Sequence, residues 1–344
     1  MRQVGQSTSK MLIAALMFAA CELGGEPASD AGSNLAPGDA GPGRTDAGIG
    51  PSPGEDAGAR PDAGSPADGG SPADGGSPGD GRDCVVGGWP KGDPSEPGPF
   101  SVVVENDVGP GAGELENGTQ PHFVLIRPKD MAQGGRCHPV ITWGNGYGDN
   151  PPTYMVLLKQ LASHGFVVVA SLSHYVSKGS PPPMKVGVDW VLEQDQDPSS
   201  PLYHRIDTAH VGATGHSAGG FATSQLGSDP RIATIATICG AAANGNLHGP
   251  ALLLCGGQDP VAKCSGMQSA LDGINQPVML ANQLSATHGS WIGSIKDPFM
   301  VAVTAWMRLH LMGDTTQRSM FFGPSCGLCT NTSVWKVQRK QMDQ

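Results

Sequence analysis

The sequence lacks a long apolar run, an excess of basic residues, and a second cysteine pair to match its one Cys-x-x-Cys motif. Its N-terminal apolar run covers only residues 11–20, which is too short to cross a bilayer as a helix. Basic residues number 21 against 31 acidic ones, so the formal net charge at pH 7 is −10. A transmembrane helix at this run and a nucleic-acid partner are therefore not expected.

The N-terminus has the parts of a secretory signal. Arg2 and Lys10 precede the apolar run, and Cys21 follows it. The tetrapeptide Phe-Ala-Ala-Cys resembles the lipobox of bacterial lipoproteins, whose Cys is acylated after cleavage, although its first residue departs from the usual Leu. We therefore predict a signal peptide over 1–21 and an exported lipoprotein at the outer membrane or cell surface, touching the membrane only through the lipid on Cys21. Plain secretion after cleavage near Ala20 is the alternative.

A linker is predicted over residues 22–83. It consists mainly of Gly, Pro, Ala, Ser and Asp, and the hexamer GSPADG repeats from Gly64. Such a chain has no apolar run whose burial could offset the entropy of ordering it, so we expect disorder. The linker also holds most of the net negative charge of the chain. The acidic balance therefore describes the linker and not a binding surface of residues 84–344.

Export permits disulfide bonds among the seven cysteines that follow Cys21. Cys239 and Cys255 lie inside apolar runs, which predicts buried core residues and not metal ligands. The Cys326-Gly-Leu-Cys329 motif has no nearby His, so we predict a structural disulfide there, with a redox or zinc motif as the weaker reading. An odd number leaves at least one thiol free, and the sequence does not decide the partners of two residues, Cys84 and Cys137.

Residues 84–344 are predicted to form one α/β domain. Apolar, β-rich runs alternate with helical patterns, which predicts a mostly parallel sheet covered by helices on both faces. An antiparallel hairpin is expected at its edge, from 101–106 and 123–128. Further strands are predicted at 139–143, 166–171, 210–214, 232–237, 251–257 and 277–283, and helices at 153–165, 186–194, 218–227 and 301–313.

The pattern Gly-x-Ser-x-Gly, which marks the nucleophile of many serine hydrolases, occurs four times, around Ser52, Ser77, Ser217 and Ser325. The first two lie in the linker and precede Pro, so no structure would hold an exposed hydroxyl there. Ser325 has no helix after it. Ser217 alone follows an apolar strand and precedes a helix of small residues, the turn that presents a serine hydroxyl at a strand end. We therefore predict that Ser217 is the nucleophile.

A serine nucleophile needs a general base, and an acid must orient that base. Asp259 ends the run ALLLCGGQDP, just past the carboxyl edge of a predicted strand, where catalytic groups gather in open α/β sheets. His288 follows the next strand in a loop and is the first His after Asp259. We predict these two residues as acid and base. The other candidates are better explained as a turn cap, solvated or helical positions, or a motif spacer: Asp229, Asp272, His216, His248 and His310.

Two backbone N–H groups are expected to bind the oxyanion. Ala218, directly after the nucleophile, supplies one of them. The second is predicted to be that of Tyr147, in the glycine-rich loop TWGNGYGDNPPTY after the third strand. An ordinary turn would also explain these glycines, but not their place between a strand and a helix.

On these motifs the chain resembles the cutinase and poly(ethylene terephthalate) hydrolase group of the α/β-hydrolase superfamily. The matches are GYGDN, GHSAGG, the Gly-Gly-Gln-Asp turn and the ATHGS loop, and the C-terminal part resembles the group's closing helix and Cys-bearing strand. The resemblance runs from about Ser101 to Cys326. It implies a monomeric serine carboxylic-ester hydrolase with a lidless site and no metal or organic cofactor. The related dienelactone hydrolases use Cys where this chain has Ser217.

One departure from that group concerns the substrate, which is expected to be a small or polymeric ester. Polyester-cleaving members carry a Trp about 25 residues after the nucleophile, whereas this chain has ICGAAANGN at 238–246. Without that ring the site lacks a large flat stacking surface, so an aromatic polyester becomes a doubtful substrate. Tyr147 and Trp291 could replace part of this surface, and an ester substrate is still expected. Two other functions stay open: a catalytically silent surface lipoprotein that only binds, and a serine peptidase on the same fold.

Overall fold

The computed structural model describes residues 82–110, 122–178 and 182–343, and these belong to one compact unit. The predicted signal peptide, Cys21 and nearly all of the predicted linker lie outside the described residues. The guanidinium of Arg82 donates to the Asp195 carboxylate at 3.0 Å, and Arg205 bonds to Asp83. The part of the chain tied to the fold therefore begins at least two residues before the predicted boundary at 84.

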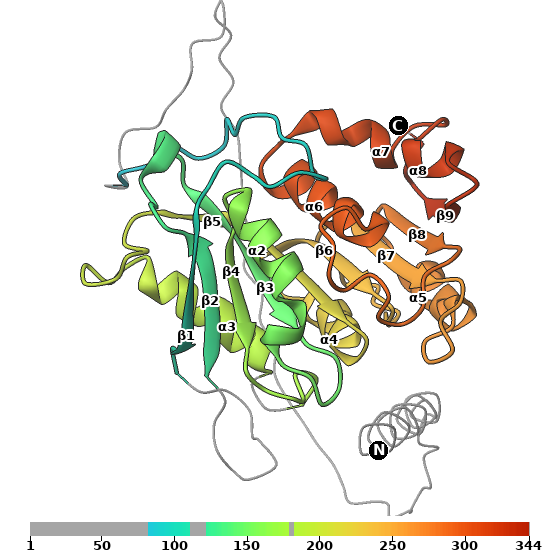
Figure 1. Ribbon diagram of the computed structural model, residues 1–344, viewed down its shortest axis with the longest axis horizontal. Coiled ribbons are helices and arrows are strands. Elements are labelled where there is room, and N and C mark those ends of the chain that lie inside the picture. Colours follow the sequence, from blue (N-terminus) through green and yellow to red (C-terminus); the bar gives the residue numbers. More distant parts are fainter. Residues whose placement is uncertain (1–81, 111–121, 179–181, 344) are drawn as a thin grey trace, which may run out of the picture. The chain divides into compact units, whose positions relative to one another are not determined.

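The core of the fold is one nine-stranded sheet among the described residues, with the order β1-β2-β4-β3-β5-β6-β7-β8-β9 (Figure 1). Six neighbouring strands, from β4 to β8, run parallel, while β1, β2 and β9 are antiparallel to their neighbours. This is the predicted α/β architecture, with the predicted hairpin at one edge. The strands are β1 Val102–Val108, β2 Phe123–Pro128, β3 His138–Gly144, β4 Val167–Ser171, β5 Ile206–His216, β6 Ile232–Ile238, β7 Ala251–Gly256, β8 Val278–Gln283 and β9 Trp335–Lys340.

Helices cover both faces of the sheet, which is why the central strands are buried along most of their length. Every residue of β3 and of β7 is buried. On one face, side chains from alternate strand positions pack with Met184, Ala222 and Leu271 of the helices in a single apolar cluster. The helices of this face are α3 Pro183–Gln194, α4 Ala218–Leu226 and α5 Gln268–Gly273; those of the other face are α2 Met155–Ser163 and α6 Pro298–Leu311 (Figure 1). None of the helices in the described part of the chain combines the length and apolar character that a membrane span needs.

The remaining elements are short, and the C-terminal ones differ from the expectation. The cysteines of the predicted Cys-bearing strand do not lie in a strand, because Cys326 caps a helical turn and β9 begins only at Trp335. Propensity alone did not reveal β9, whose residues alternate in burial at the sheet edge. These elements are η1 Gln133–Gly135, η2 Pro151–Tyr154, η3 Cys264–Met267, η4 Thr315–Gln317, α7 Arg318–Phe321 and α8 Gly327–Thr330.

Three disulfides join cysteines of the described residues. Cys326 and Cys329 are bonded as predicted, and the two cysteines whose partners the sequence left open, Cys84 and Cys137, bond to each other. Cys255 is buried as expected, but it is also bonded to Cys264, a pairing that the sequence analysis missed. The thiol left free is that of the buried Cys239.

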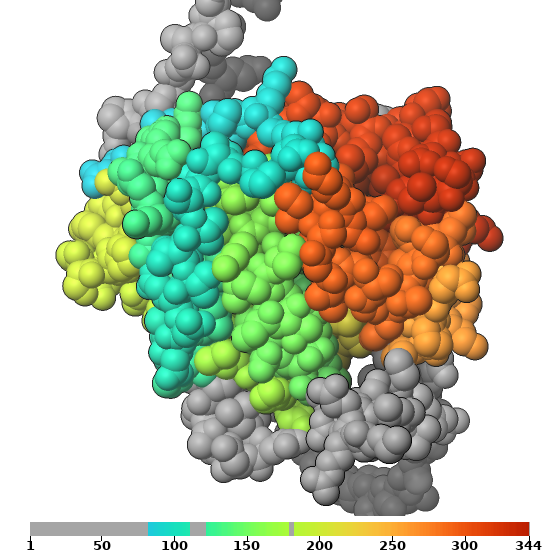
Figure 2. All heavy atoms as spheres, in the orientation of Figure 1, coloured from blue at the N-terminus to red at the C-terminus, as the bar shows by residue number. Residues whose placement is uncertain are grey.

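A buried arginine fastens the N-terminal segment, residues 82–100, to the C-terminal part of the domain. Arg308 on α6 forms a buried ion pair with Asp314 and donates at 2.6 Å to the carbonyl oxygen of Pro90. It also donates to Nδ1 of His164 at 3.1 Å. Figure 2 shows this segment in cyan, lying against the orange and red C-terminal part. Each N–H of the guanidinium that faces the interior thus has an acceptor, as a buried charge requires.

The surroundings of His164 predict a loss of stability in acid. Burial, reinforced by Arg308, lowers the pKa of His164 to about 4. Between pH 4 and the ordinary pKa near 6.5, this histidine is protonated in the unfolded chain but not in the folded one. The free energy of unfolding therefore falls as the pH drops, by about 1.4 kcal/mol per pH unit for such a group. We expect His164→Gln to reduce the difference in unfolding free energy between pH 7 and pH 5 by about 1–2 kcal/mol.

Urea unfolding at the two pH values measures this difference. The matched control is His248→Gln, at an exposed position, which should leave the pH dependence as in the unmodified protein. A His164→Gln protein whose stability follows pH as steeply as the unmodified one would contradict the assignment.

Candidate functional site

Ser217 lies at the sharp turn where β5 ends and α4 begins. Its backbone is in the left-handed region, with φ 56°, and its N–H donates to the carbonyl oxygen of Ile238 on the neighbouring strand at 2.9 Å. A left-handed conformation is costly for a non-glycine residue, so the surrounding structure must enforce it. Two glycines allow this: a Cβ on Gly219 would lie 2.0 Å from the Gly144 carbonyl oxygen, and one on Gly240 would lie 2.3 Å from that of Ser217.

Asp259 and His288 meet at the same edge of the sheet. Asp259 follows β7 and His288 follows β8, and Nδ1–H of His288 donates to Oδ2 of Asp259 at 2.7 Å. The other carboxylate oxygen of Asp259 accepts from the N–H groups of Val261 and Ala262, at 2.7 and 2.9 Å. Burial alone would raise the pKa of Asp259, but the hydrogen bonds from His288 and these backbone groups outweigh it and lower the pKa below its ordinary value. Asp259 is therefore an anion at neutral pH, bonded to the imidazole.

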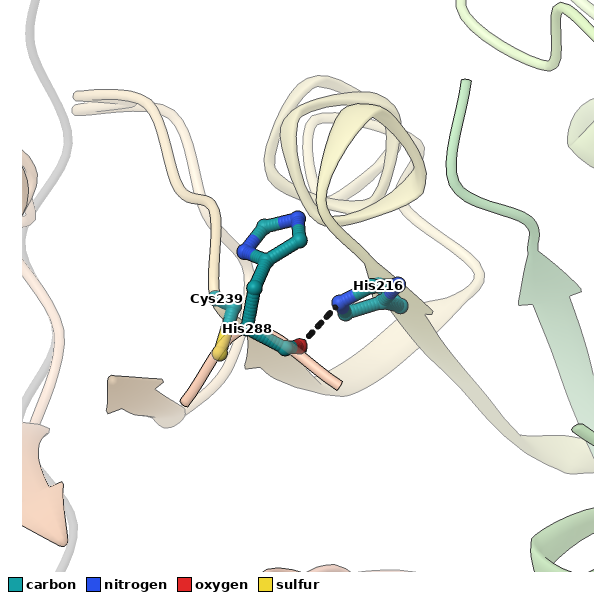
Figure 3. A group of neighbouring side chains, drawn as sticks. All are labelled: His216, Cys239 and His288. Atoms are coloured by element: carbon teal, nitrogen blue, oxygen red, sulfur yellow. Dashed lines mark hydrogen bonds between the residues drawn. The ribbon is translucent and has the colours of Figure 1, made fainter. Parts of the chain in front are cut away.

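His216, the residue before Ser217, takes part in the site through its ring. Its Nε2–H donates to the backbone carbonyl oxygen of His288 at 2.8 Å (Figure 3), and its Nδ1 lies 3.0 Å from the hydroxyl of Tyr154. Burial, followed by the nearby His288, lowers the pKa of His216 to about 3. The ring is therefore neutral at pH 7. The sequence analysis regarded this residue as a spacer, and nothing in the motif indicates a bond to a loop 72 positions away.

The two aromatic residues predicted to contact substrate lie in different environments. Tyr147 is half-exposed, in the loop after β3, and its ring packs at 4.8 Å against that of Tyr175. The prediction that Trp291 contacts substrate is wrong, because its side chain is fully buried and offers no surface to a ligand. Its ring stacks on Tyr154 at 6.0 Å and its Nε1–H donates to the His288 carbonyl oxygen at 3.3 Å. Trp291 therefore supports the loop that carries His288.

The two predicted oxyanion donors lie on the segments expected to carry them. Ala218 is the first residue of α4, where a backbone N–H has no partner within the helix. Tyr147 follows the carboxyl end of β3, the strand beside β5 in the sheet. The two segments touch, since Gly219 packs against Gly144 and Asn145.

Cys239 lies close to His216 and His288, directly after β6. Like Ser217, it has a left-handed backbone, with φ 52°. Its sulfur and one nitrogen each of His216 and His288 all lie within 4.8 Å of one another (Figure 3). Metal ions bind the thiolate and the free imidazole lone pair. Here burial and Asp259 raise the pKa of the thiol, and both ring nitrogens of His216 and Nδ1 of His288 already have hydrogen-bond partners. This chemistry fits a hydrogen-bonded cluster better than a metal centre.

Apart from His216, the candidates that the sequence analysis set aside lie elsewhere. The Asp229 carboxylate bonds to Arg231 in the turn before β6, and Asp272 is exposed on α5. The ring of His310 packs against Trp306 at 4.3 Å on α6. Ser325, the other Gly-x-Ser-x-Gly serine within the described residues, is exposed near the C-terminus.

Comparison with protein-family models places the chain in a known family. A model described as PETase, PET hydrolase-like, matches residues 137–336, more than half of the chain. The matched span contains Ser217, Asp259 and His288, and both segments proposed to bind the oxyanion. No curated protein matches the chain.

Proposed function

The chain belongs to the PET hydrolase-like family of ester hydrolases, and from that membership we propose that it is a serine carboxylic-ester hydrolase acting through Ser217, His288 and Asp259. The observation that carries the assignment of residues is the 2.7 Å hydrogen bond between His288 and a buried carboxylate. It lies at the same sheet edge as a serine held in a left-handed turn. A carboxylate bonded to Nδ1 in this way fixes the tautomer and orientation of the imidazole base in serine hydrolases.

In the proposed reaction, the Ser217 hydroxyl oxygen attacks the carbonyl carbon of the ester, and Nε2 of His288 accepts the hydroxyl proton. The tetrahedral intermediate then expels the alcohol, which takes that proton, and leaves an acyl-enzyme. Water attacks the acyl-enzyme with the same base, which releases the acid and restores Ser217. Asp259 keeps the proton of the imidazole on Nδ1, so that Nε2 is free to accept, and stabilises the imidazolium that forms.

The negative oxygen of the intermediate is proposed to accept from the N–H groups of Ala218 and Tyr147. The position of Ala218 at the first turn of α4 supports this role, because the helix dipole favours negative charge there. One such donor contributes about 3 kcal/mol of transition-state stabilisation in other hydrolases.

The half-exposed pair of Tyr147 and Tyr175 is the aromatic surface that we propose for contact with the acyl group. With Trp291 buried and no aromatic residue in 239–246, this pair is the remaining support for binding an aromatic ester. Small and aliphatic esters are therefore the first substrates to test. A series of p-nitrophenyl esters of rising acyl length will show the preferred chain.

A fluorophosphonate probe tests the proposal directly, because only an activated serine reacts covalently with it. We expect stoichiometric labelling of Ser217, located by mass spectrometry of the tryptic peptide. A protein that is not labelled and turns over no ester would favour the alternative function, a catalytically silent lipoprotein that only binds. Matched p-nitrophenyl ester and peptide p-nitroanilide substrates decide against a peptidase, since equal or faster amide cleavage would contradict an esterase.

We further propose that the protein is exported and acylated at Cys21. The support is the N-terminal sequence itself, with basic residues, a short apolar run and then Cys. Cys21→Ser is expected to move the protein from the membrane fraction to the soluble one. An unchanged distribution would leave plain secretion or another anchor.

A further inference from the structure

A buried tyrosine hydroxyl lies where the proposed oxyanion loop meets the segment that carries the nucleophile. Tyr154 ends η2 and is fully buried. Its hydroxyl oxygen accepts from the N–H of Gly146 at 3.1 Å, its O–H donates to Asp149 Oδ2 at 3.0 Å, and Nδ1 of His216 lies 3.0 Å from the same oxygen. Burial, with the nearby Asp149, raises the pKa of Tyr154, so the hydroxyl keeps its proton. The hydroxyl therefore links the loop after β3, through Gly146 and Asp149, to the ring of His216.

The partners of His216 decide which of its nitrogens carries a proton. The carbonyl oxygen of His288 can only accept, and it lies 2.8 Å from Nε2, so Nε2 must be protonated for a hydrogen bond to form. The ring is neutral at pH 7 and holds a single proton. Nδ1 then has a lone pair, and the group that faces it is the Tyr154 hydroxyl. The opposite tautomer would set the Nε2 lone pair against the carbonyl oxygen.

We propose that Tyr154 is a positioning residue that holds the ring of His216 in place, and that His216, protonated on the Nε2 that faces a carbonyl oxygen, holds the backbone of His288 in turn. The inference rests on the proposed function only in taking His288 as the base. The tautomer itself can be measured without any catalysis.

Packing around the three rings supports this role. Trp291 stacks on Tyr154 at 6.0 Å and meets the edge of His216 at 5.4 Å. It also donates to the same His288 carbonyl oxygen that His216 binds, at 3.3 Å. The backbone of the proposed base is thus held by two side chains, and the orientation of one of them depends on the Tyr154 hydroxyl. A gain or loss of 1 Å in such a contact costs up to about 100-fold in rate.

The first experiment is a long-range ¹H–¹⁵N correlation spectrum of the full-length protein with ¹⁵N-labelled histidine at pH 7. We expect one histidine, assigned by its absence in His216→Phe, to show the shifts of a pure Nε2–H tautomer. In Tyr154→Phe we expect the Nδ1 signal of this ring to shift, because Nδ1 loses the hydroxyl that faces it, while Nε2 keeps its proton. A wild-type His216 protonated on Nδ1, or a Tyr154→Phe spectrum with every signal of His216 unchanged, would overturn the proposal. The wild-type measurement stands even if Tyr154→Phe prevents folding.

The second experiment measures kinetics on a p-nitrophenyl ester. We expect Tyr154→Phe to lower kcat by about 10–100-fold, while KM stays within about twofold, because the hydroxyl orients the base and binds no substrate. Tyr203→Phe makes the same chemical change at a residue that precedes β5, at the opposite end of this strand from Ser217, and should leave kcat unchanged. A Tyr154→Phe enzyme with normal kcat, or with KM alone raised, would contradict a positioning role. If the wild-type protein cleaves no ester at all, the proposed function fails while the tautomer result still decides this inference.

Discussion

Replacing Ser217 with Ala is expected to reduce ester turnover by roughly 10⁵–10⁶-fold, because in the proposed mechanism the hydroxyl of Ser217 forms the acyl-enzyme. The change removes one oxygen atom and keeps the Cβ, so the left-handed turn keeps its support from Gly219 and Gly240. The thermal midpoint should therefore change by no more than a few degrees. Initial rates on a p-nitrophenyl ester and a thermal melt measure the two quantities on the same preparation.

The chain provides its own matched control for this prediction. Ser325 lies in the same Gly-x-Ser-x-Gly pattern, but it is exposed. Contrary to the expectation, a short helix, α8, begins two residues later, yet no strand leads into Ser325, so it does not lie in a strand-to-helix turn. Ser325→Ala should retain full activity and full labelling by a fluorophosphonate. Activity that survives in Ser217→Ala but is lost in Ser325→Ala would show that the choice among the four serines is wrong.

Asp259→Asn is expected to lower kcat by about 10⁴-fold while the fold is retained. The reason lies in the hydrogen bonds of the carboxylate. One oxygen accepts from two backbone N–H groups, so the Asn side chain will keep its carbonyl oxygen there. Its NH₂ group must then face Nδ1 of His288. That nitrogen becomes an acceptor, the ring proton moves to Nε2, and Nε2 can no longer take the proton of Ser217.

Steady-state kinetics with the same ester measure this effect, and Asp272→Asn is the control. Asp272 is an exposed aspartate on α5, and its only role in the sequence analysis was as an alternative acid. We expect its variant to keep normal activity. If both variants were equally active, Asp259 would not be the residue that orients the base, whatever its distance from His288.

The fold was predictable to the extent that its pattern is local. Apolar runs of five to seven residues between helical stretches predicted the parallel strands, because a strand buried on both faces needs apolar side chains at every position. The edge strand β9 was missed because it lacks the continuous apolar pattern of a buried strand. Only one of its six residues is buried and two are exposed, so its composition resembles that of a loop. Its pairing with β8 becomes evident only when the two segments are brought together.

The site divides in the same way. Ser217, Asp259 and His288 could be chosen from sequence, because a strand-end turn limits where a nucleophile can lie and the order of strands limits the acid and the base. Residues that support the site only through tertiary contacts have no recognisable pattern in the sequence. Tyr154 lies in an ordinary helix start, and the burial of Trp291 reverses its predicted role from substrate contact to support for the His288 loop.

The sequence by itself determined the class of the fold, the single serine with a suitable turn and the few acids and histidines that could serve it. These follow from the covalent order of residues and from local periodicity. Only the tertiary structure decided which distant groups touch: the pairing of Cys84 with Cys137 and of Cys255 with Cys264, the carboxylate bound to His288 and the hydroxyl that faces His216. Such contacts depend on how strands and loops far apart in the chain pack, and no short stretch of sequence encodes that.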